Sequence, residues 1–184
     1  MTSQSHGPTL VLPVGSRDHA KGPANAPVTL VEYGDYECPH CGRAHPIVRS
    51  IQHALGERLR FVFRNFPLTE VHPNAENAAE AAEAAGAQGK FWEMHDELFD
   101  NQQALAPPDL MAYGRRLELD TDAMGVALER HNHAARVRED FMSGVRSGVN
   151  GTPTFFLNGK RYDGEWDRRH LLAVIEEIIE SVVE

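Results

Sequence analysis

The sequence predicts an α/β protein in which a strand–helix–strand segment and a strand–strand–helix segment flank a long helical region. Patterns typical of strands occur near the two ends of the chain, whereas roughly residues 67–148 repeat apolar side chains at helical intervals. No internal repeat or low-complexity linker interrupts this order. With 184 residues and 41% hydrophobic residues, the chain has the composition of a globular domain that buries a core.

The first β-rich segment contains two predicted strands. Residues 28–33 (VTLVEY) form an apolar run typical of a buried strand, with one charged residue, Glu32, inside it. Over residues 59–64, large apolar side chains occupy every second position, which indicates a second strand. Joined by a helix, the two strands form a right-handed strand–helix–strand unit.

The connecting helix is predicted to begin at Cys38 and to end near Gly56. Pro39 suits the first helical position, where a missing amide hydrogen costs nothing. Pro46 removes one hydrogen bond in the middle of the helix, so we expect a kink there.

The central region is predicted to be all helical. Residues 78–87 are rich in Ala and Glu, which favours a helix with a solvated acidic face. In the following helix, Trp92 and His95 stand at apolar spacing, which indicates packing rather than ligand binding. Further helices are expected over residues 108–119, 121–132 and 134–147.

The second β-rich segment begins with residues 154–157 (TFFL), which predict a strand. Asn158-Gly159 is a strong hairpin turn that leads into a strand at Arg161-Tyr162. The last helix has one apolar stripe at helical spacing, formed by Leu171, Val174, Ile175, Ile178, Ile179 and Val182.

The expected boundaries follow from this order. The chain divides into an N-terminal extension (1–24), a strand–helix–strand half (25–66), a helical insertion (67–148) and a strand–strand–helix half (149–184). Residues 1–27 are polar and broken by Gly and Pro, without the apolar run of a signal peptide. A cytoplasmic location is therefore expected, unless an export signal was removed.

Composition also restricts the partners. The net charge of −9 and the lack of a basic tract exclude nucleic acid as the main partner. No stretch approaches the roughly 20 apolar residues that span a bilayer. No dimerisation segment precedes the domain, so we expect a monomer.

Both cysteines of the chain lie in one motif, Cys38-Pro39-His40-Cys41. This spacing allows one sulfur to attack a disulfide and the other to resolve the intermediate, as in a dithiol/disulfide redox centre. Cys38 stands at a helix N-terminus, where unpaired N–H groups and the helix dipole favour a thiolate. Cys41 follows one turn later on the same face and is expected to be buried.

Three charged or titratable neighbours act on the Cys38 thiolate. His40 can donate to the sulfur or supply positive charge, whereas Asp35 and Glu37 place negative charge near it and oppose ionisation. The net direction of the exchange therefore stays open at this point.

Two other classes of function compete with the redox hypothesis. A Cys-x-x-Cys pair can supply half of a structural zinc site, but no second cysteine pair exists and His131-Asn132-His133 lacks the usual histidine spacing. A non-enzymatic interaction module on the same scaffold is the other alternative, because a fold does not fix a function.

Five segments together resemble one family. The order of elements, with Cys-x-x-Cys at the start of the first long helix, resembles a thioredoxin fold with an inserted all-helical subdomain. More narrowly, the chain resembles the DsbA-like thiol:disulfide oxidoreductases over about residues 22–180. The matching segments are residues 26–42, 64–68 (RNFPL), 72–75 (HPNA), 88–92 (QGKFW) and 151–155 (GTPTF).

The resemblance implies roles for individual residues. It assigns Cys38 and Cys41 to catalysis, with Pro39 and His40 between them, and associates a histidine at that position with an oxidising couple. It also implies that Glu32, in the strand beneath the site, exchanges a proton with the buried cysteine. A buried carboxylate would have a raised pKa suited to this task, whereas a carboxylate that reaches solvent or a salt bridge would not.

A second pair of residues is implied to bind substrate. By resemblance, Pro153 follows a cis peptide bond and faces the cysteines, which leaves the backbone of Thr152 able to pair with an extended substrate segment. The plain alternative is a loop proline that only starts a strand.

The resemblance implies an enzyme that exchanges disulfides with proteins, as an oxidase or an isomerase. Its substrates would be proteins with thiols or disulfides, and an unidentified redox partner would reset the Cys38–Cys41 pair. It implies no metal and no cofactor beyond that redox-active disulfide. The alternative is a cytosolic thioredoxin-like disulfide reductase.

Overall fold

The computed structural model describes residues 7–183. Within this range the strands are β1 (His19–Lys21), β2 (Val28–Gly34), β3 (Leu59–Asn65), β4 (Thr154–Leu157) and β5 (Lys160–Tyr162). The helices are α1 (Pro39–Leu55), a 3₁₀ turn (Gly56–Arg58), α2 (Ala75–Ala87), α3 (Phe91–Asp100), α4 (Pro107–Arg116), α5 (Thr121–Glu129), α6 (Ala134–Arg146) and α7 (Arg168–Val183).

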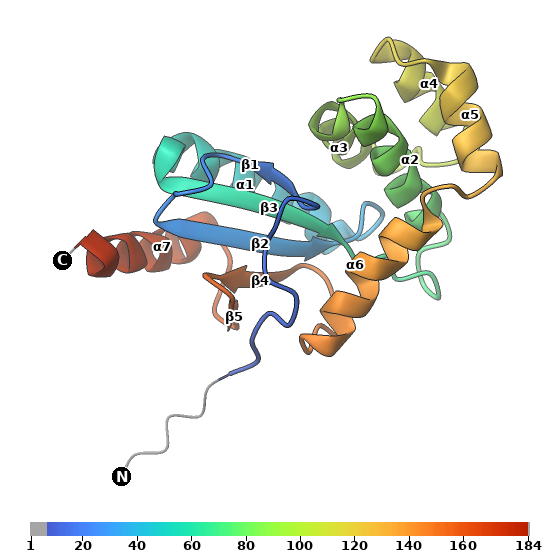
Figure 1. Ribbon diagram of the computed structural model, residues 1–184. Coiled ribbons are helices and arrows are strands. Elements are labelled where there is room, and N and C mark those ends of the chain that lie inside the picture. Colours follow the sequence, from blue (N-terminus) through green and yellow to red (C-terminus); the bar gives the residue numbers. More distant parts are fainter. Residues whose placement is uncertain (1–6, 184) are drawn as a thin grey trace. The chain divides into compact units, whose positions relative to one another are not determined.

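The strands form one sheet in the order β1-β3-β2-β4-β5. β1 pairs antiparallel with β3, and β4 pairs antiparallel with both β2 and β5. β2 and β3 run in the same direction (Figure 1), as expected for strands joined by a helix. The predicted strands at residues 28–33, 59–64 and 154–157 are confirmed.

β1 lies inside the predicted N-terminal extension, residues 1–24, of which residues 1–6 are outside the described range. The sequence of β1, His-Ala-Lys, has no apolar alternation. Its strand conformation comes from pairing with Phe61–Phe63 of β3. The sheet therefore extends into this segment because of a partner strand rather than a local pattern.

The predicted hairpin between β4 and β5 is confirmed. Asn158 and Gly159 have φ angles of 48° and 81°, the left-handed conformation that a tight two-residue hairpin turn requires. The Asn158 side chain also accepts a hydrogen bond from Thr29 N at 2.8 Å, which ties the turn to β2.

The chain divides into two compact units. Among the described residues, the first comprises 7–33, 44–64 and 143–183, and the second comprises Gly34–Arg43 and Asn65–Met142. The turn and the first helical residues that hold the two cysteines therefore group with the helices. The predicted boundaries at residues 67 and 148 do not show this division.

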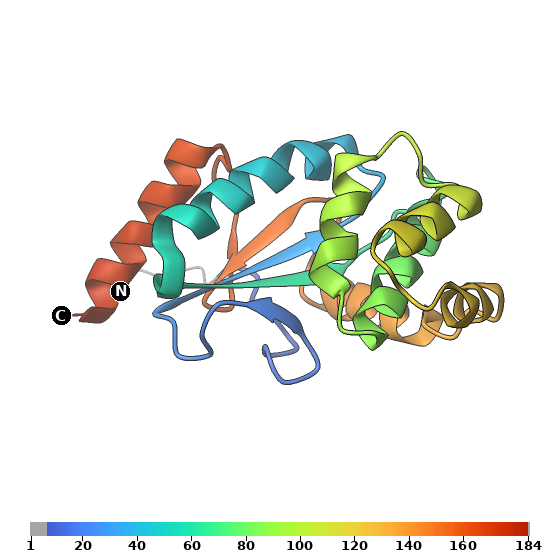
Figure 2. The same ribbon diagram turned by 90° about the horizontal axis from the view of Figure 1, so that it is seen from above.

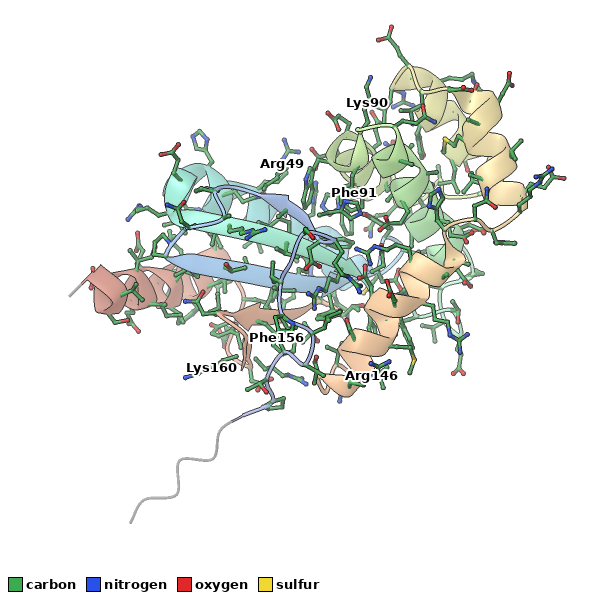
Figure 3. All side chains as sticks on the ribbon, in the orientation of Figure 1. Arg49, Lys90, Phe91, Arg146, Phe156 and Lys160 are labelled. Carbon is green, nitrogen blue, oxygen red and sulfur yellow. The ribbon has the colours of Figure 1, made fainter. Side chains whose placement is uncertain are left out.

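The first unit is built on the sheet. Residues 44–55 of α1 and helix α7 lie on the same face of it (Figure 2), and Arg168 Nε donates to Ser50 Oγ at 2.6 Å between them. Phe156 of β4, labelled in Figure 3, packs edge-on against Tyr33 of β2 with ring centroids 5.8 Å apart. The strands and helices of this unit thus bury a continuous apolar core.

A buried ion pair anchors the chain before β1. Arg64 on β3 is fully buried, and its guanidinium binds both oxygens of Asp18 at 2.8 and 3.0 Å. It also donates to the carbonyl of Leu12 and to the hydroxyl of Tyr33, each at 2.9 Å. Burial lowers the pKa of Arg64, but the interactions with Asp18 and Tyr33 outweigh it and raise the pKa above its ordinary value. The group stays charged and fixes the segment from Leu12 to Asp18.

The second unit is a cluster of helices. Figure 1 shows α2, α3, α4 and α5 gathered together in green and yellow. Phe91 of α3, labelled in Figure 3, packs with His95 at 5.9 Å between ring centroids, and His95 is 3% exposed. The predicted packing role of His95 is confirmed.

The predicted solvated acidic face of α2 is wrong for Glu80 and Glu83, which are 0% and 6% exposed. Glu80 accepts a hydrogen bond from His131 Nδ1 at 2.8 Å, and Glu83 accepts one from Asn65 Nδ2 at 2.9 Å. Partners distant in sequence therefore let these carboxylates be buried.

Asp140 of α6 is another buried carboxylate in the second unit. It accepts a hydrogen bond from Asn65 N at 3.0 Å and pairs with Arg136 one turn earlier. Burial raises the pKa of Asp140, and Arg136 offsets part of this effect. Within the second unit, Asn65 is thereby tied to α6.

No helix in residues 7–183 combines the length and the apolar character that a bilayer crossing needs.

Replacing Asp18 with Ala is expected to lower the free energy of unfolding by about 3–5 kcal/mol, because it leaves the Arg64 guanidinium buried without its carboxylate. Denaturant unfolding followed by circular dichroism measures this loss. The matched control is Asp163→Ala, which removes the exposed partner of Arg161 and is expected to change stability by less than about 1 kcal/mol.

The double variant Asp18→Ala/Arg64→Met separates charge from packing. Removing both charges is expected to restore part of the lost stability, since an apolar side chain of similar length does not need a counter-ion. A double variant that is less stable than Asp18→Ala would contradict this explanation.

Candidate active site at the cysteine pair

The two cysteines occupy the start of α1. Cys38 directly precedes the helix, and its carbonyl accepts the first helical hydrogen bond from Gly42 N at 3.0 Å. Pro39 occupies the first helical position, as predicted. Both cysteines are thiols in this structure and are buried, at 3% and 0% exposure. Cys38 thus stands where the unpaired N–H groups of a helix favour an anion.

Cys41 lies one turn further on, where its sulfur accepts a hydrogen bond from Asp35 N at 3.5 Å. A backbone N–H directed at sulfur stabilises its ionised form more than its neutral form. The turn before the helix therefore contacts the second cysteine as well as the first.

Asp35 organises this turn through a buried carboxylate, 1% exposed. Its Oδ1 accepts hydrogen bonds from Glu37 N at 2.8 Å and from Cys38 N at 3.2 Å. Its Oδ2 accepts from Leu68 N and from His72 Nδ1, both at 2.8 Å. One carboxylate thus joins the cysteine turn to residues 68–72. The sequence indicated only the charge of Asp35, not this connection.

His72 is the ionisable partner of Asp35. Its side chain is 19% exposed and forms an ion pair with the carboxylate. Burial lowers the pKa of His72, but the hydrogen bond and the negative charge of Asp35, together with Cys38 and Glu37, raise it above its ordinary value. A positive charge is therefore favoured beside the cysteine turn.

Glu37, the second acidic neighbour, binds the same segment. Its carboxylate accepts hydrogen bonds from Asn74 N at 2.7 Å and from Asn74 Nδ2 at 3.1 Å. The two acids that the sequence set against the thiolate therefore both have donors: His72 balances Asp35, and the Asn74 amides bind Glu37. The HPNA segment, residues 72–75, supplies both partners.

Gln102 also binds the cysteine turn, through backbone carbonyls rather than N–H groups. Its Nε2 donates to the carbonyl of Tyr36 at 2.8 Å and to the carbonyl of Cys38 at 2.9 Å. A Cβ atom at Gly42 would lie 2.0 Å from Gln102 Oε1, so the glycine is needed for this approach. No motif in the sequence marks Gln102, which lies in the loop after α3.

His40 is exposed and bonds to Arg43, with 2.6 Å between His40 Nδ1 and Arg43 Nη2. A guanidinium can only donate, so Nδ1 is the acceptor and Nε2 is the nitrogen with a proton to donate. This orientation defines which nitrogen of His40 is available to a sulfur or a substrate.

The remaining residues predicted for the site belong to the first unit. Glu32 is 2% exposed on β2, opposite Phe155 of β4, so the alternative in which its carboxylate reaches solvent is wrong. The peptide bond between Thr152 and Pro153 is cis, the isomer that the resemblance implies. Pro153 directly precedes β4.

Comparison with protein families identifies the class. The family model described as thioredoxin matches residues 16–177. The chain therefore belongs to the thioredoxin family.

Solved structures narrow the fold. BdbD from Bacillus subtilis in its oxidised form has a TM-score of 0.83 at 24% identity, covering 95% of this chain and 97% of its own. Wolbachia pipientis alpha-DsbA1 has a TM-score of 0.80 at 19% identity, covering 95% and 96%. A thioredoxin-like oxidoreductase from Silicibacter pomeroyi has a TM-score of 0.75 at 25% identity, covering 90% and 94%. The predicted DsbA-like thioredoxin fold is confirmed.

The curated relatives that match this chain in sequence are named as antiporters, not as oxidoreductases. The Na(+)/H(+) antiporter NhaA 1 of Salinispora arenicola is 50% identical over 167 residues, which is 90% of this chain and 26% of that protein. The protein of the same name from Mycobacterium sp. strain KMS is 44% identical over 173 residues, which is 92% of this chain and 28% of that protein. The chain spans about a quarter of the length of these relatives.

Replacing Gln102 with Ala is expected to lower the free energy of unfolding of the dithiol form by about 1–3 kcal/mol, because two carbonyls lose their side-chain donor. The exposed neighbour Gln103, replaced with Ala, is the matched control and is expected to leave stability unchanged. Equilibrium unfolding in denaturant measures both.

Gly42→Ala tests the same contact from the opposite side, since the added methyl group displaces the Gln102 amide. The losses in Gly42→Ala and Gln102→Ala are expected to be non-additive in the double variant, because both remove one interaction. Strictly additive losses would show that the two residues act independently.

Proposed function

We propose that the chain is a protein thiol:disulfide oxidoreductase of the DsbA type. Cys38 is the sulfur that exchanges with substrate in both directions, and Cys41 is the resolving sulfur. The observation that best supports this is the placement of Cys38 at the N-terminus of α1, where its N–H donates to the Asp35 carboxylate and its carbonyl accepts a hydrogen bond from Gln102. Membership of the thioredoxin family and the DsbA-like fold agree with it.

In the oxidising direction, a substrate thiolate attacks Cys38 of the Cys38–Cys41 disulfide. The Cys38–Cys41 bond breaks, a mixed disulfide forms, and Cys41 leaves as a thiolate. The N–H of Asp35, 3.5 Å from Cys41 Sγ, is placed to stabilise that leaving group. A second substrate thiolate then attacks the substrate sulfur of the mixed disulfide and releases Cys38 as a thiolate. Substrate loses two electrons and the enzyme gains them.

The redox partner that removes these electrons is unidentified. In the opposite direction the same steps reduce a substrate disulfide, with Cys38 as nucleophile, which is the thioredoxin-like alternative. The stability of the Cys38 thiolate and the pool of redox partners decide between oxidation and reduction of substrate. The direction therefore also depends on the compartment in which the chain works.

The roles of the other predicted residues are part of this proposal. His40 supplies a donor to the ionised Cys38, Glu32 exchanges a proton with Cys41, and the backbone at Thr152-Pro153 pairs with substrate. The burial of Glu32 and the isomer of the Thr152–Pro153 bond are consistent with these roles.

A disulfide-transfer assay tests the function. The oxidised chain, mixed with a reduced and unfolded protein substrate, is expected to introduce disulfides stoichiometrically and to lose this activity in Cys38→Ser. Cys41→Ser is expected to accumulate a mixed disulfide through Cys38, because the resolving thiol is missing. Unchanged activity of Cys38→Ser in the cell would support the interaction module, and about one zinc per chain with no reactive dithiol would support the metal site.

Equilibrium with glutathione decides the direction. A reduction potential near about −120 mV supports a DsbA-like oxidase, whereas one near about −270 mV supports a thioredoxin-like reductase. The measurement uses the wild-type chain and needs no substrate protein.

A second candidate function concerns the partner. High identity to proteins named sodium/proton antiporters, over about a quarter of their length, supports a redox module that works with a membrane transporter. Trapping with Cys41→Ser in membranes is then expected to yield mixed disulfides with a transporter. A trap that captures only proteins unrelated to transporters would contradict this candidate.

A further inference from the structure

The cysteine turn contains an electrostatic conflict. The carboxylate of Asp35 is buried and accepts a hydrogen bond from the backbone N–H of Cys38 at 3.2 Å. A negative charge so close to the cysteine opposes its ionisation, and low solvent exposure weakens screening. A thiol-exchange site that depends on a Cys38 thiolate therefore needs a compensating positive charge at Asp35.

The donors around Asp35 identify the source of that charge. Three of the four are backbone N–H groups, from Glu37, Cys38 and Leu68, and carry no net charge. The fourth is the imidazole of His72, at 2.8 Å from Oδ2. At 19% exposure, its ring still exchanges protons with solvent. His72 is therefore the only titratable donor among these four.

We propose that His72 is a positioning residue for thiol exchange: its imidazolium neutralises Asp35 and so permits Cys38 to remain a thiolate. This inference rests on the proposed function of the cysteine pair and adds a regulator of it. It also assigns a redox-linked proton to His72, which is bound more tightly when Cys38 is a thiolate than when Cys38 is in a disulfide.

The groups that act on His72 agree with this assignment. Burial lowers its pKa, and Asp35, Cys38 and Glu37 raise it, with Asp35 the strongest of the three. Because a Coulomb interaction is mutual, the imidazolium favours the Cys38 thiolate just as the thiolate raises the pKa of His72. Formation of the Cys38–Cys41 disulfide removes the thiolate charge, and with it that part of the attraction.

The sign of the pH effect follows. The pKa of His72 is raised in the folded chain, so its ion pair with Asp35 contributes stability that is fully present below about pH 6.5, the ordinary histidine value. This contribution is lost as pH rises through the raised pKa of the folded state. The same loss of charge removes the support for the Cys38 thiolate.

Proton NMR titration of the wild-type chain tests the redox link without a substitution in the site. The pKa of His72 is expected to be higher in the dithiol form than in the disulfide form. His53, exposed on α1, is the internal control. Equal His72 values in the two forms would overturn the proposal.

Kinetics of Cys38 alkylation test the effect on the thiolate. His72→Asn retains a neutral donor for Asp35 but removes the charge, and is expected to slow alkylation at pH 6 by about three- to tenfold. The glutathione equilibrium constant is expected to shift by a similar factor, toward a less oxidising disulfide. His53→Asn is the matched control, with neither quantity changed.

The outcomes separate this inference from the proposed function. Wild-type chain whose cysteines do not exchange with glutathione would contradict the proposed function itself. Normal exchange in the wild type with unchanged alkylation and potential in His72→Asn would contradict only the role of His72. The circular dichroism spectrum and the unfolding midpoint of His72→Asn serve to exclude a folding defect.

Discussion

One buried carboxylate fixes the backbone around the two cysteines. Asp35 gathers hydrogen bonds from the turn that precedes α1 and from residues 68–72, so both cysteines rest on a backbone fixed by a single side chain. Without it, the N–H groups of Glu37 and Leu68 would lose their acceptor, which costs about 1–3 kcal/mol for each group that stays buried and unpaired. The N–H of Cys38 would keep the carbonyl of Asp35, at 3.2 Å. Four hydrogen-bond donors offset the cost of burying the Asp35 carboxylate, although this carboxylate lies close to the cysteines.

The same physical solution recurs elsewhere in the chain. Arg64 fixes the segment before β1 through Asp18, and Asp140 fixes the end of β3 through Asn65. In each case a segment at or beyond the end of a strand is fixed by a buried polar side chain that accepts or donates several hydrogen bonds. Such contacts are directional, so they specify one backbone path where apolar packing alone would tolerate several.

Sequence patterns predicted those parts of the molecule that depend on local periodicity. The apolar run of β2, the alternation of β3 and the Asn158-Gly159 turn each contain their own signal, and the helix start at Pro39 does as well. β1 contains none, because only its pairing with β3 makes it a strand.

Contacts between residues distant in sequence limit how much of the candidate site the sequence can predict. The motif identified Cys38 and Cys41, but the donors to Asp35 lie 33 and 37 positions later, at Leu68 and His72. Gln102 lies 64 positions after Cys38. Charge alone indicated that Asp35 opposes the thiolate, and only the fold shows that a histidine balances it. The burial of Glu80 was missed for the same reason, since its partner His131 is 51 positions away.

The approach of Gln102 to Gly42 also constrains how this chain can diverge. A side chain at position 42 and a glutamine at position 102 compete for the same space, because a Cβ atom would lie 2.0 Å from the amide oxygen. The two positions should therefore covary among related proteins: where the glycine after the second cysteine is replaced, the residue after α3 should become smaller or leave the turn. Substitutions at a loop residue far from the cysteine motif would then follow substitutions at the glycine next to that motif.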